Sequence, residues 1–318
     1  MTAPQRSLAV CNDRYVDLQV NGYAGVDFNS DTLDAAHFER ACRAMERDGV
    51  SCCLPTIITD TLERMISRIA RLTACSRAGD VAGRLVAGIH IEGPFLSPLA
   101  GYRCAHPIDA IMPANVDALA RLIDAGDGLA RLVTLAPEQD ERAIATRWLA
   151  DRGVLVSAGH TNASLDQLRR SIDAGLRLFT HLGNGCPRVG MDRHDNIIQR
   201  VLSLAADRRI TPCFIADGVH VPFVALRNYI RLVGTDACIV VTDAMAAAGL
   251  GPGRHRLGRW EVDVGEDLAA WAPDRSHLVG SAMSLPRARA NLRDIGFSDT
   301  DCAALLHDNP ARLLGTNG

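Results

Sequence analysis

The chain has 318 residues, which corresponds to about two domains of roughly 150 residues each or to one large α/β barrel. Hydrophobic residues make up 47% of the sequence and charged residues 22%, so disordered, collagen-like and coiled-coil chains are excluded. The formal net charge of -3 argues against a nucleic acid or an anionic membrane as partner, since both bind proteins with an excess of basic residues.

Arginine supplies all the basic side chains, because the 34 lysine and arginine residues include no lysine. A chain without lysine cannot form a lysine Schiff base or hold a phosphate group with a P-loop lysine. It also cannot provide the carboxylated lysine that bridges the ions of some two-metal hydrolase sites. The composition therefore excludes three kinds of functional site before any motif is considered.

The ten cysteines are too few for a disulfide-stabilised scaffold and include no Cys-x-x-Cys pair. Most lie in apolar runs, such as residues 52–54 and 237–239, so we expect buried, reduced thiols. The first residues contain no apolar stretch long enough for a signal peptide, and no apolar run reaches the roughly 18 residues of a membrane span. These features predict a cytoplasmic protein.

Short apolar runs alternate with segments of helical periodicity along most of the chain, which is typical of strand–helix units around a parallel sheet. In the first helical segment, Phe38, Ala41, Cys42 and Met45 recur at the spacing of one helix face. Eight strands followed by helices predict a single TIM-type (β/α)8 barrel. The predicted strands are residues 16–20, 51–57, 85–91, 131–135, 153–157, 176–180, 210–215 and 237–242.

The sequence changes character after the eighth predicted strand. Residues 249–258 are rich in glycine and proline, and residues 260–264 alternate like a strand, which predicts a hairpin. Helices are expected over 284–293 and near 301–307. The whole chain, 1–318, is therefore predicted to be one barrel domain with strands from about 16 to 242 and a C-terminal hairpin and helices over 250–318.

Polar residues follow most of the predicted strands, at the rim where the loops of such a barrel build the active site. Taken singly, each has a structural explanation, as a hydrogen-bonded histidine or a helix-capping aspartate. Their convergence from strands three, five, six, seven and eight indicates a functional site instead. The residues are Gln19, Asn21, Glu92, His160, His181, Asn184, Asp217, His220 and Asp243.

One carboxylate and two histidines from separate strands form a three-ligand set that leaves a fourth position for water, as in catalytic zinc sites. A metal lowers the pKa of its water toward about 7, so Asp243 would serve as the base. Cys186 is a competing ligand, disfavoured because it lies several residues beyond the strand that precedes His181. His90, one pleat below Glu92, is expected to support the site rather than bind metal.

Two motifs carry a resemblance to a known family. Residues 90–94 read His-Ile-Glu-Gly-Pro and residues 158–163 read Ala-Gly-His-Thr-Asn-Ala. With these motifs the sequence resembles the N-acetylglucosamine-6-phosphate deacetylases, a family of the amidohydrolase superfamily. The resemblance implies an amidohydrolase-type barrel and extends over nearly the whole chain, through residues 16–22, 55–56, 135–138, 180–184, 215–220, 241–244 and 280–281.

The resemblance implies hydrolysis of the acetamido group of N-acetylglucosamine 6-phosphate to glucosamine 6-phosphate and acetate. Glu92, His160 and His181 would bind one divalent ion, with zinc favoured and iron, cobalt, manganese or nickel as alternatives. Asp243 would act as general acid and base. His220 would contact the substrate carbonyl or the sugar hydroxyls.

Substrate contacts are implied for further residues by the same resemblance. Asn184 and the backbone at Gly185 would face the phosphate, and His106 matches a histidine that binds the sugar phosphate group. Arg193 stands near the position of an arginine that reaches the phosphate across a homodimer interface, with one extra residue between it and His181. An ordinary surface arginine is the alternative explanation for Arg193.

Three departures from the family pattern shape the remaining expectations. Gln19 and Asn21 replace the His-x-His pair that holds a second metal in many superfamily members, which predicts a mononuclear site. About 15 residues precede the first strand and few follow Leu314, so we expect the companion β-sandwich to be absent or strongly reduced. A longer loop over 97–106, together with Gly183 and Gly185 beside Asn184, points to a different pocket shape.

Two other functions stay open at this stage. The same machinery could act on another N-acylated compound, such as N-acetylgalactosamine 6-phosphate, an unphosphorylated amino sugar or an N-acyl amino acid. A non-catalytic sugar-binding barrel is the alternative from another class. It is disfavoured because a binding module has no need of both a metal-ligand set and a base.

Overall fold

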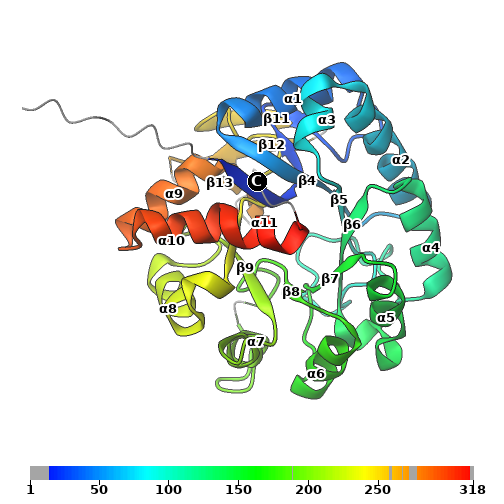
Figure 1. The fold of residues 1–318 in the computed structure, drawn as a ribbon, viewed down its shortest axis with the longest axis vertical. Coiled ribbons are helices and arrows are strands. Elements are labelled where there is room, and N and C mark those ends of the chain that lie inside the picture. The colour runs from blue at the N-terminus through cyan, green and yellow to red at the C-terminus, as the bar shows by residue number, and fades with distance from the viewer. Residues whose placement is uncertain (1–13, 188, 258–259, 267, 272–277, 316–318) are drawn as a thin grey trace, which may run out of the picture.

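The computed structural model describes residues 14–187, 189–257, 260–266, 268–271 and 278–315. Eight parallel strands form one nearly closed barrel in which each strand pairs with the next along the chain (Figure 1). The predicted α/β barrel is therefore confirmed. Its strands are β1 (Tyr15–Val20), β4 (Val50–Ile58), β5 (Ile89–Glu92), β6 (Ala130–Leu135), β7 (Leu155–Ala158), β8 (Leu178–Phe179), β9 (Thr211–Ile215) and β10 (Ile239–Val241).

The barrel closes between its first and last strands through a buried carboxylate. Asp17 on β1 accepts a hydrogen bond of 2.6 Å from the Thr242 hydroxyl and one of 3.2 Å from the Thr242 N–H. A parallel bridge between Val20 and Ala244 continues the pairing at the carboxyl end. These contacts hold together two segments that lie more than two hundred residues apart in the sequence.

Helices surround the barrel on its outer side (Figure 1). The predicted apolar stripe of α1 is buried, and the Asp34 side chain caps the helix by accepting from the His37 N–H at 2.8 Å. The helices and 3-10 turns of this layer are α1 (Ala35–Arg47), α2 (Leu62–Ala78), α3 (Asp80–Leu85), α4 (Val116–Ala125), η1 (Pro137–Gln139), η2 (Glu141–Ala143), α5 (Ile144–Ala150), α6 (Leu165–Ala174), α7 (Ile197–Ala206), α8 (Phe223–Val233) and η3 (Thr235–Ala237).

The segment after the barrel contains more strand than the predicted hairpin. The hairpin of β11 (Gly253–Leu257) and β12 (Trp260–Val264) extends into a four-stranded antiparallel sheet with β13 (Ala269–Trp271) and β14 (Leu278–Ser281). A short ribbon, β2 (Gly22–Tyr23) with β3 (Val26–Asp27), follows β1. The absence of a companion β-sandwich stays a prediction.

The last helical segment, residues 299–314, covers the amino end of the barrel, opposite the rim that carries the polar residues. Asn309 donates 2.7 Å hydrogen bonds to the carbonyls of Thr235 and Cys238, which precede β10. The predicted short helix at 301–307 is wrong in length, because helical structure runs without a break over 299–314. The elements are α9 (Leu285–Asp294), α10 (Asp299–Ala303), η4 (Ala304–Asp308) and α11 (Asn309–Leu314).

Four predicted strands begin at least two residues before the strands in the structure. Leu85 is the last residue of α3, and β5 starts only at Ile89, because a short apolar run suits a buried helix end as well as a strand. Gly88 separates the two elements at a point where a Cβ atom would lie 2.5 Å from the Cβ of Arg131. Likewise β7 starts at Leu155 rather than at residue 153, β8 at Leu178 rather than at 176, and β10 at Ile239 rather than at 237.

No helix in the described part of the chain has the length and apolar character that a membrane span needs. The nine cysteines that the structure describes are all free thiols, and most of them are buried, as expected from their apolar sequence context.

The buried tie between β1 and β10 predicts a pH-dependent stability. Burial raises the pKa of Asp17 to about 7, against the hydrogen bonds from Thr242 and Gln19. An acid whose pKa is higher in the folded than in the unfolded state takes up a proton on folding, so its stabilisation is lost as the pH rises toward 7. The wild type should lose roughly 2–3 kcal/mol of its free energy of unfolding between about pH 5 and pH 8 through this group. The Asp17→Asn variant stays neutral at every pH and should not show that loss.

Urea unfolding of the wild type and the variant at both pH values measures this difference. Asp124→Asn, at an exposed position, is the control and should change stability equally at both pH values. An equal effect of Asp17→Asn at both pH values would contradict an elevated pKa of Asp17.

Candidate metal-binding active site

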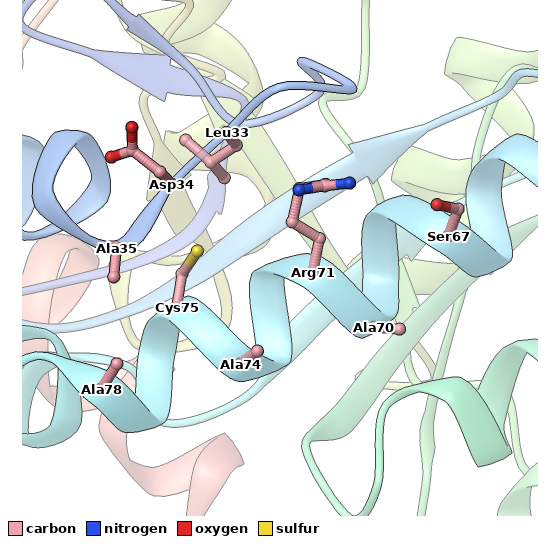
Figure 2. A pocket seen from close by; sticks show the side chains of 9 residues that line it. All are labelled: Leu33, Asp34, Ala35, Ser67, Ala70, Arg71, Ala74, Cys75 and Ala78. Carbon is pink, nitrogen blue, oxygen red and sulfur yellow. The ribbon is translucent and has the colours of Figure 1, made fainter.

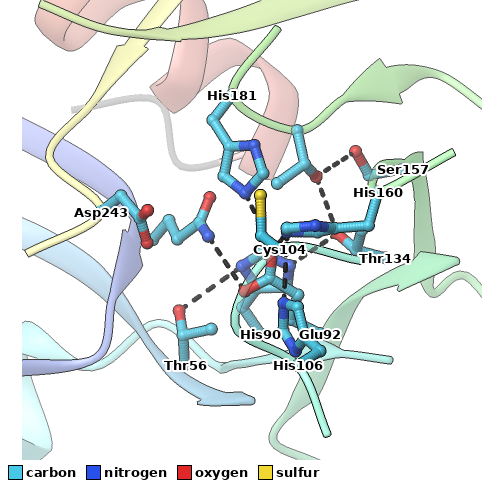
Figure 3. Close-up of polar contacts among 12 residues, drawn as sticks. Thr56, His90, Glu92, Cys104, His106, Thr134, Ser157, His160, His181 and Asp243 are labelled. Atoms are coloured by element: carbon cyan, nitrogen blue, oxygen red, sulfur yellow. Dashed lines mark hydrogen bonds and ion pairs between the residues drawn. The ribbon is translucent and has the colours of Figure 1, made fainter. Parts of the chain in front are cut away.

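The carboxyl ends of four barrel strands bring four polar side chains together. Glu92 is the last residue of β5, whereas His160, His181 and Asp243 each follow the end of β7, β8 and β10 by two positions. Parallel strands end at the same rim, so these side chains point toward one another (Figure 3). The convergence predicted from the sequence is present in the structure.

Three of these four residues have an unusual backbone conformation. The φ angles of His160, His181 and Asp243 are 49°, 32° and 49°, in the left-handed region that is costly for side chains other than glycine. Such strain costs on the order of 1–3 kcal/mol per residue and persists where the surrounding structure imposes it. Its concentration at one rim supports a functional rather than a folding role for these residues.

The Glu92 carboxylate lies at the centre of the cluster and is almost fully buried. Its Oε1 atom is 3.0 Å from Nε2 of His181 and 3.2 Å from Nε2 of His160. Its Oε2 atom accepts a hydrogen bond of 3.2 Å from the amide of Gln19. Burial opposes ionisation, but the two imidazoles hold the pKa of Glu92 well below its usual range. Glu92 therefore offers a buried, charged carboxylate oxygen as a metal ligand.

A backbone carbonyl fixes the orientation of His160. Its Nδ1 atom is 2.9 Å from the carbonyl oxygen of Tyr102, which can only accept, so Nδ1 carries the hydrogen. In the neutral ring, Nε2 then carries a lone pair that faces the Glu92 oxygen. Because both atoms are acceptors, a cation or a second proton must lie between them. Metal-binding histidines commonly donate their other N–H in this way.

A proton can take that place, as the direction of the pKa shift of His160 indicates. Burial lowers the pKa of His160, but Cys104 and Glu92 raise it to about 10. The same arrangement that favours this proton favours a cation.

The separations of Glu92 from the two histidines fit one divalent ion, although the ligand atoms that all lie within 4.8 Å of one another are those of Glu92, His160 and His106. A tetrahedral site with bonds of about 2.0–2.1 Å has edges of about 3.3–3.4 Å. The 3.0 Å and 3.2 Å separations that Glu92 makes with His181 and His160 are close to that length. His181 Nδ1 is buried and has no hydrogen-bond partner among the described residues. Two imidazoles and one carboxylate form a donor set that a catalytic zinc ion accepts.

Asp243 lies beside these groups and is nearly buried. Its Oδ1 atom accepts a hydrogen bond of 2.7 Å from the amide of Asn21. Burial raises the pKa of Asp243, and Glu92 adds to the rise, while His181, His220 and Asn21 partly offset it. A carboxyl group with a raised pKa can accept a proton and release it again near neutral pH.

Asp217 orients His220, a relation that sequence analysis missed. Its Oδ1 atom accepts the N–H groups of Val219 and His220, both at 2.9 Å, and its Oδ2 atom is 2.5 Å from Nδ1 of His220. Burial raises the pKa of Asp217, but the contact with His220 brings it below its usual value. The Asp-x-x-His spacing after β9 was the only sign of this pair in the sequence.

The amides expected at the second-metal positions are engaged in hydrogen bonds to the cluster. Gln19 donates to Glu92 and Asn21 donates to Asp243. His90 contacts the Thr134 hydroxyl at 2.8 Å and a backbone carbonyl of β1, as expected for a supporting residue.

The residues expected to contact substrate lie at different depths. His106 is buried, with Nε2 3.2 Å from Nε2 of His160. Gly185 packs against His160, since a Cβ atom there would lie 3.0 Å from Nδ1 of that ring. Asn184 is half-buried, whereas Arg193 is exposed on the loop before α7. The phosphate contacts predicted for these residues stay predictions. Cys186, the competing ligand, donates its thiol to the carbonyl of Gly183.

A groove on the helical layer lies elsewhere, between the start of α1 and one face of α2 (Figure 2). Its walls are mostly small apolar side chains, and its polar residues do not form a ligand cluster. The groove is lined by Leu33, Asp34, Ala35, Ser67, Ala70, Arg71, Ala74, Cys75 and Ala78.

Known proteins resemble this chain over most of its length, although no family model matches it. The N-acetylglucosamine-6-phosphate deacetylase of Bos taurus is 34% identical over 310 residues, which cover 95% of this chain and 73% of that protein. This chain belongs to the N-acetylglucosamine-6-phosphate deacetylase family. Another relative, the N-acetylgalactosamine-6-phosphate deacetylase of Escherichia coli O157:H7, is 30% identical and covers 100% of this chain and 81% of its own length.

Solved structures agree with membership of the deacetylase family. The Mycobacterium smegmatis N-acetyl-D-glucosamine-6-phosphate deacetylase D267A mutant, solved in complex with N-acetyl-D-glucosamine-6-phosphate, superimposes with a TM-score of 0.81 at 32% identity. The match covers 95% of this chain and 77% of that one. The chain is therefore a hydrolytic enzyme of the amidohydrolase superfamily.

Proposed function

We propose that this enzyme removes the N-acetyl group of N-acetylglucosamine 6-phosphate and releases glucosamine 6-phosphate and acetate. The observation that carries the proposal is the Glu92 carboxylate set between His160 and His181, with Asp243 beside it. The names of the relatives support the substrate class. A sugar-binding barrel without activity would not need this combination of ligands and base.

Glu92, His160 and His181 would hold one divalent ion, and a donor set of imidazole nitrogens and one carboxylate favours zinc. When bound, the ion would lower the pKa of a coordinated water toward about 7 and polarise the amide carbonyl. Because Gln19 and Asn21 offer amide groups already bonded to Glu92 and Asp243, we propose a mononuclear centre.

Asp243 would move the proton in both halves of the reaction. Its carboxylate accepts a proton from the attacking water as the water oxygen bonds to the acetamido carbon. It then transfers that proton to the sugar nitrogen as the C–N bond breaks, so acetate and the free amine leave. The chain itself forms no covalent bond to the acyl group.

His220 would stabilise the negative charge that develops on the carbonyl oxygen. In a protonated imidazole both nitrogens are donors, and the Asp217 carboxylate at 2.5 Å stabilises that form. With Nδ1 bonded to Asp217, His220 would use its Nε2–H for this contact.

Recognition of the phosphate would fall to Asn184, to the backbone at Gly185 and to Arg193 from the second subunit of a homodimer. An arginine binds a phosphate group through two parallel N–H donors. N-acetylgalactosamine 6-phosphate is the second candidate substrate, because a relative that covers the whole of this chain bears that name. The free thiols agree with a cytoplasmic location, which stays a prediction.

Acetate release from a panel of sugars tests the function most simply. The panel contains N-acetylglucosamine and N-acetylgalactosamine, each with and without the 6-phosphate, assayed with added zinc and with a chelator. We expect the highest kcat/KM on N-acetylglucosamine 6-phosphate and loss of activity with the chelator. No acetate from any sugar by the zinc-loaded protein would contradict the proposal.

Replacement of the proposed base separates catalysis from metal binding. Asp243→Asn keeps an acceptor for the Asn21 amide but cannot take a proton, so kcat should fall by about 10²–10⁴-fold. Metal content, measured on the same sample by elemental analysis, should be unchanged. Asp236→Asn, on the η3 turn away from the rim, is the control. A normal rate in Asp243→Asn would remove Asp243 from this role.

Arg193 allows a test of phosphate recognition. Loss of a charged hydrogen bond costs about 1.5–3 kcal/mol, so Arg193→Ala should lower kcat/KM for the phosphorylated sugar by roughly 10–100-fold. The unphosphorylated sugar should be affected little. Arg170→Ala, which removes another exposed arginine, serves as control. Equal losses on both sugars would refute a specific phosphate contact.

A further inference from the structure

Residues 135–138 belong to the segments that resemble the family, but the site described above leaves them without a role. They end in Glu138, which lies on the η1 turn directly after β6. In the barrel, β6 stands between β5, which carries Glu92, and β7, which is followed by His160. The half-buried Glu138 therefore lies at the rim between two strands that lead to metal ligands.

The Glu138 carboxylate binds the two residues that follow His160. Its Oε1 atom accepts the N–H of Asn162 at 2.8 Å, and its Oε2 atom accepts the hydroxyl of Thr161. The same hydroxyl oxygen accepts the N–H of Ala163 at 2.9 Å. Hydrogen bonds to a carboxylate are roughly twice as strong as those between neutral groups. One charged side chain thus fixes the conformation of residues 161–163.

The backbone of His160 needs such an anchor. Its φ angle of 49° is unfavourable for a residue with a Cβ atom and persists only where the surrounding structure imposes it. The Gly159 N–H donates to the carbonyl of Leu135 at 3.1 Å, and the His160 carbonyl accepts the Ser97 N–H at 2.9 Å. On the side that follows His160, Glu138 supplies the matching restraint.

The direction of the His160 ring depends on that backbone. Relaxation of φ toward the ordinary range would swing the Cβ atom, and with it the Nε2 atom that lies 3.2 Å from Glu92 Oε1. Metal–ligand distances tolerate changes of only about 0.2 Å. A small rotation at His160 is therefore enough to weaken binding of an ion.

We propose that Glu138 is a positioning residue, whose carboxylate holds the segment after His160 so that the imidazole is directed at the metal site. The inference rests on the metal centre proposed above. Glu138 is not itself a ligand, because its two oxygens are engaged by Thr161 and Asn162. Its replacement should leave the barrel folded and lower the affinity for the ion.

Zinc affinity of the metal-free protein, measured by competition with a chelator, tests this role without an activity assay. In Glu138→Gln an amide group that cannot accept replaces one oxygen, so zinc should bind about tenfold more weakly. Thr161→Val removes the hydroxyl from the same contact and should also weaken zinc binding. Thr161→Ser keeps the hydroxyl and should bind zinc like the wild type. Because Glu138→Gln and Thr161→Val disrupt one interaction, their combined loss should be smaller than the product of the single losses.

Asp140→Asn is a matched control from the end of the same turn. The Asp140 carboxylate also accepts two backbone N–H groups and one hydroxyl, but these belong to Ala145 and Thr146 at the start of α5. Asp140→Asn should lower the free energy of unfolding and leave zinc affinity unchanged. Visible absorption of the cobalt(II)-saturated proteins gives a second measurement, which should change in Glu138→Gln and not in Asp140→Asn.

Wild-type zinc affinity in Glu138→Gln, or an equal loss of affinity in Asp140→Asn, would overturn the positioning role and leave the metal centre in place. If Glu138→Gln does not fold, Thr161→Val decides in the same way. A wild-type protein that binds no zinc would overturn the metal centre itself, so the two failures are distinguishable.

Discussion

A buried carboxylate between two imidazoles is the interaction on which the site depends. A charge removed from water must be paired, and Glu92 meets this demand through His160 and His181 on one oxygen and Gln19 on the other. These partners come from three different strands. The cluster therefore exists only when the barrel is assembled. The carbonyl of Tyr102 accepts the hydrogen on Nδ1 of His160, so the lone pair on Nε2 faces Glu92. Both features favour a cation at this position.

The same contacts that close the barrel also position the proposed base. Thr242 is bonded to Asp17 on the first strand, and Asp243 follows it with a left-handed backbone and a hydrogen bond from Asn21. Strain at Asp243 is tolerated because the neighbouring residues are held from two sides. The contacts that close the sheet therefore also fix the position of the Asp243 carboxyl group.

Much of this arrangement could be predicted from sequence, because strand ends in a parallel barrel share one rim. Glu92, His160, His181 and Asp243 were recognised by that rule and by the family motifs. Strand starts were less predictable, since apolar runs such as the one at Leu85 suit helix ends equally well. The contact of His106 with His160 and the role of the Tyr102 carbonyl depend on loop conformation, which leaves no periodic signal in the sequence.

Anomalous diffraction from crystals of the zinc-loaded protein tests the central claim most directly. Data collected at the absorption edge of the metal locate the ion without reference to activity. The account predicts one strong peak per chain, within bonding distance of Glu92 Oε1 and of the Nε2 atoms of His160 and His181. A fully loaded crystal with its ion bound elsewhere, or with no peak at this rim, would contradict it.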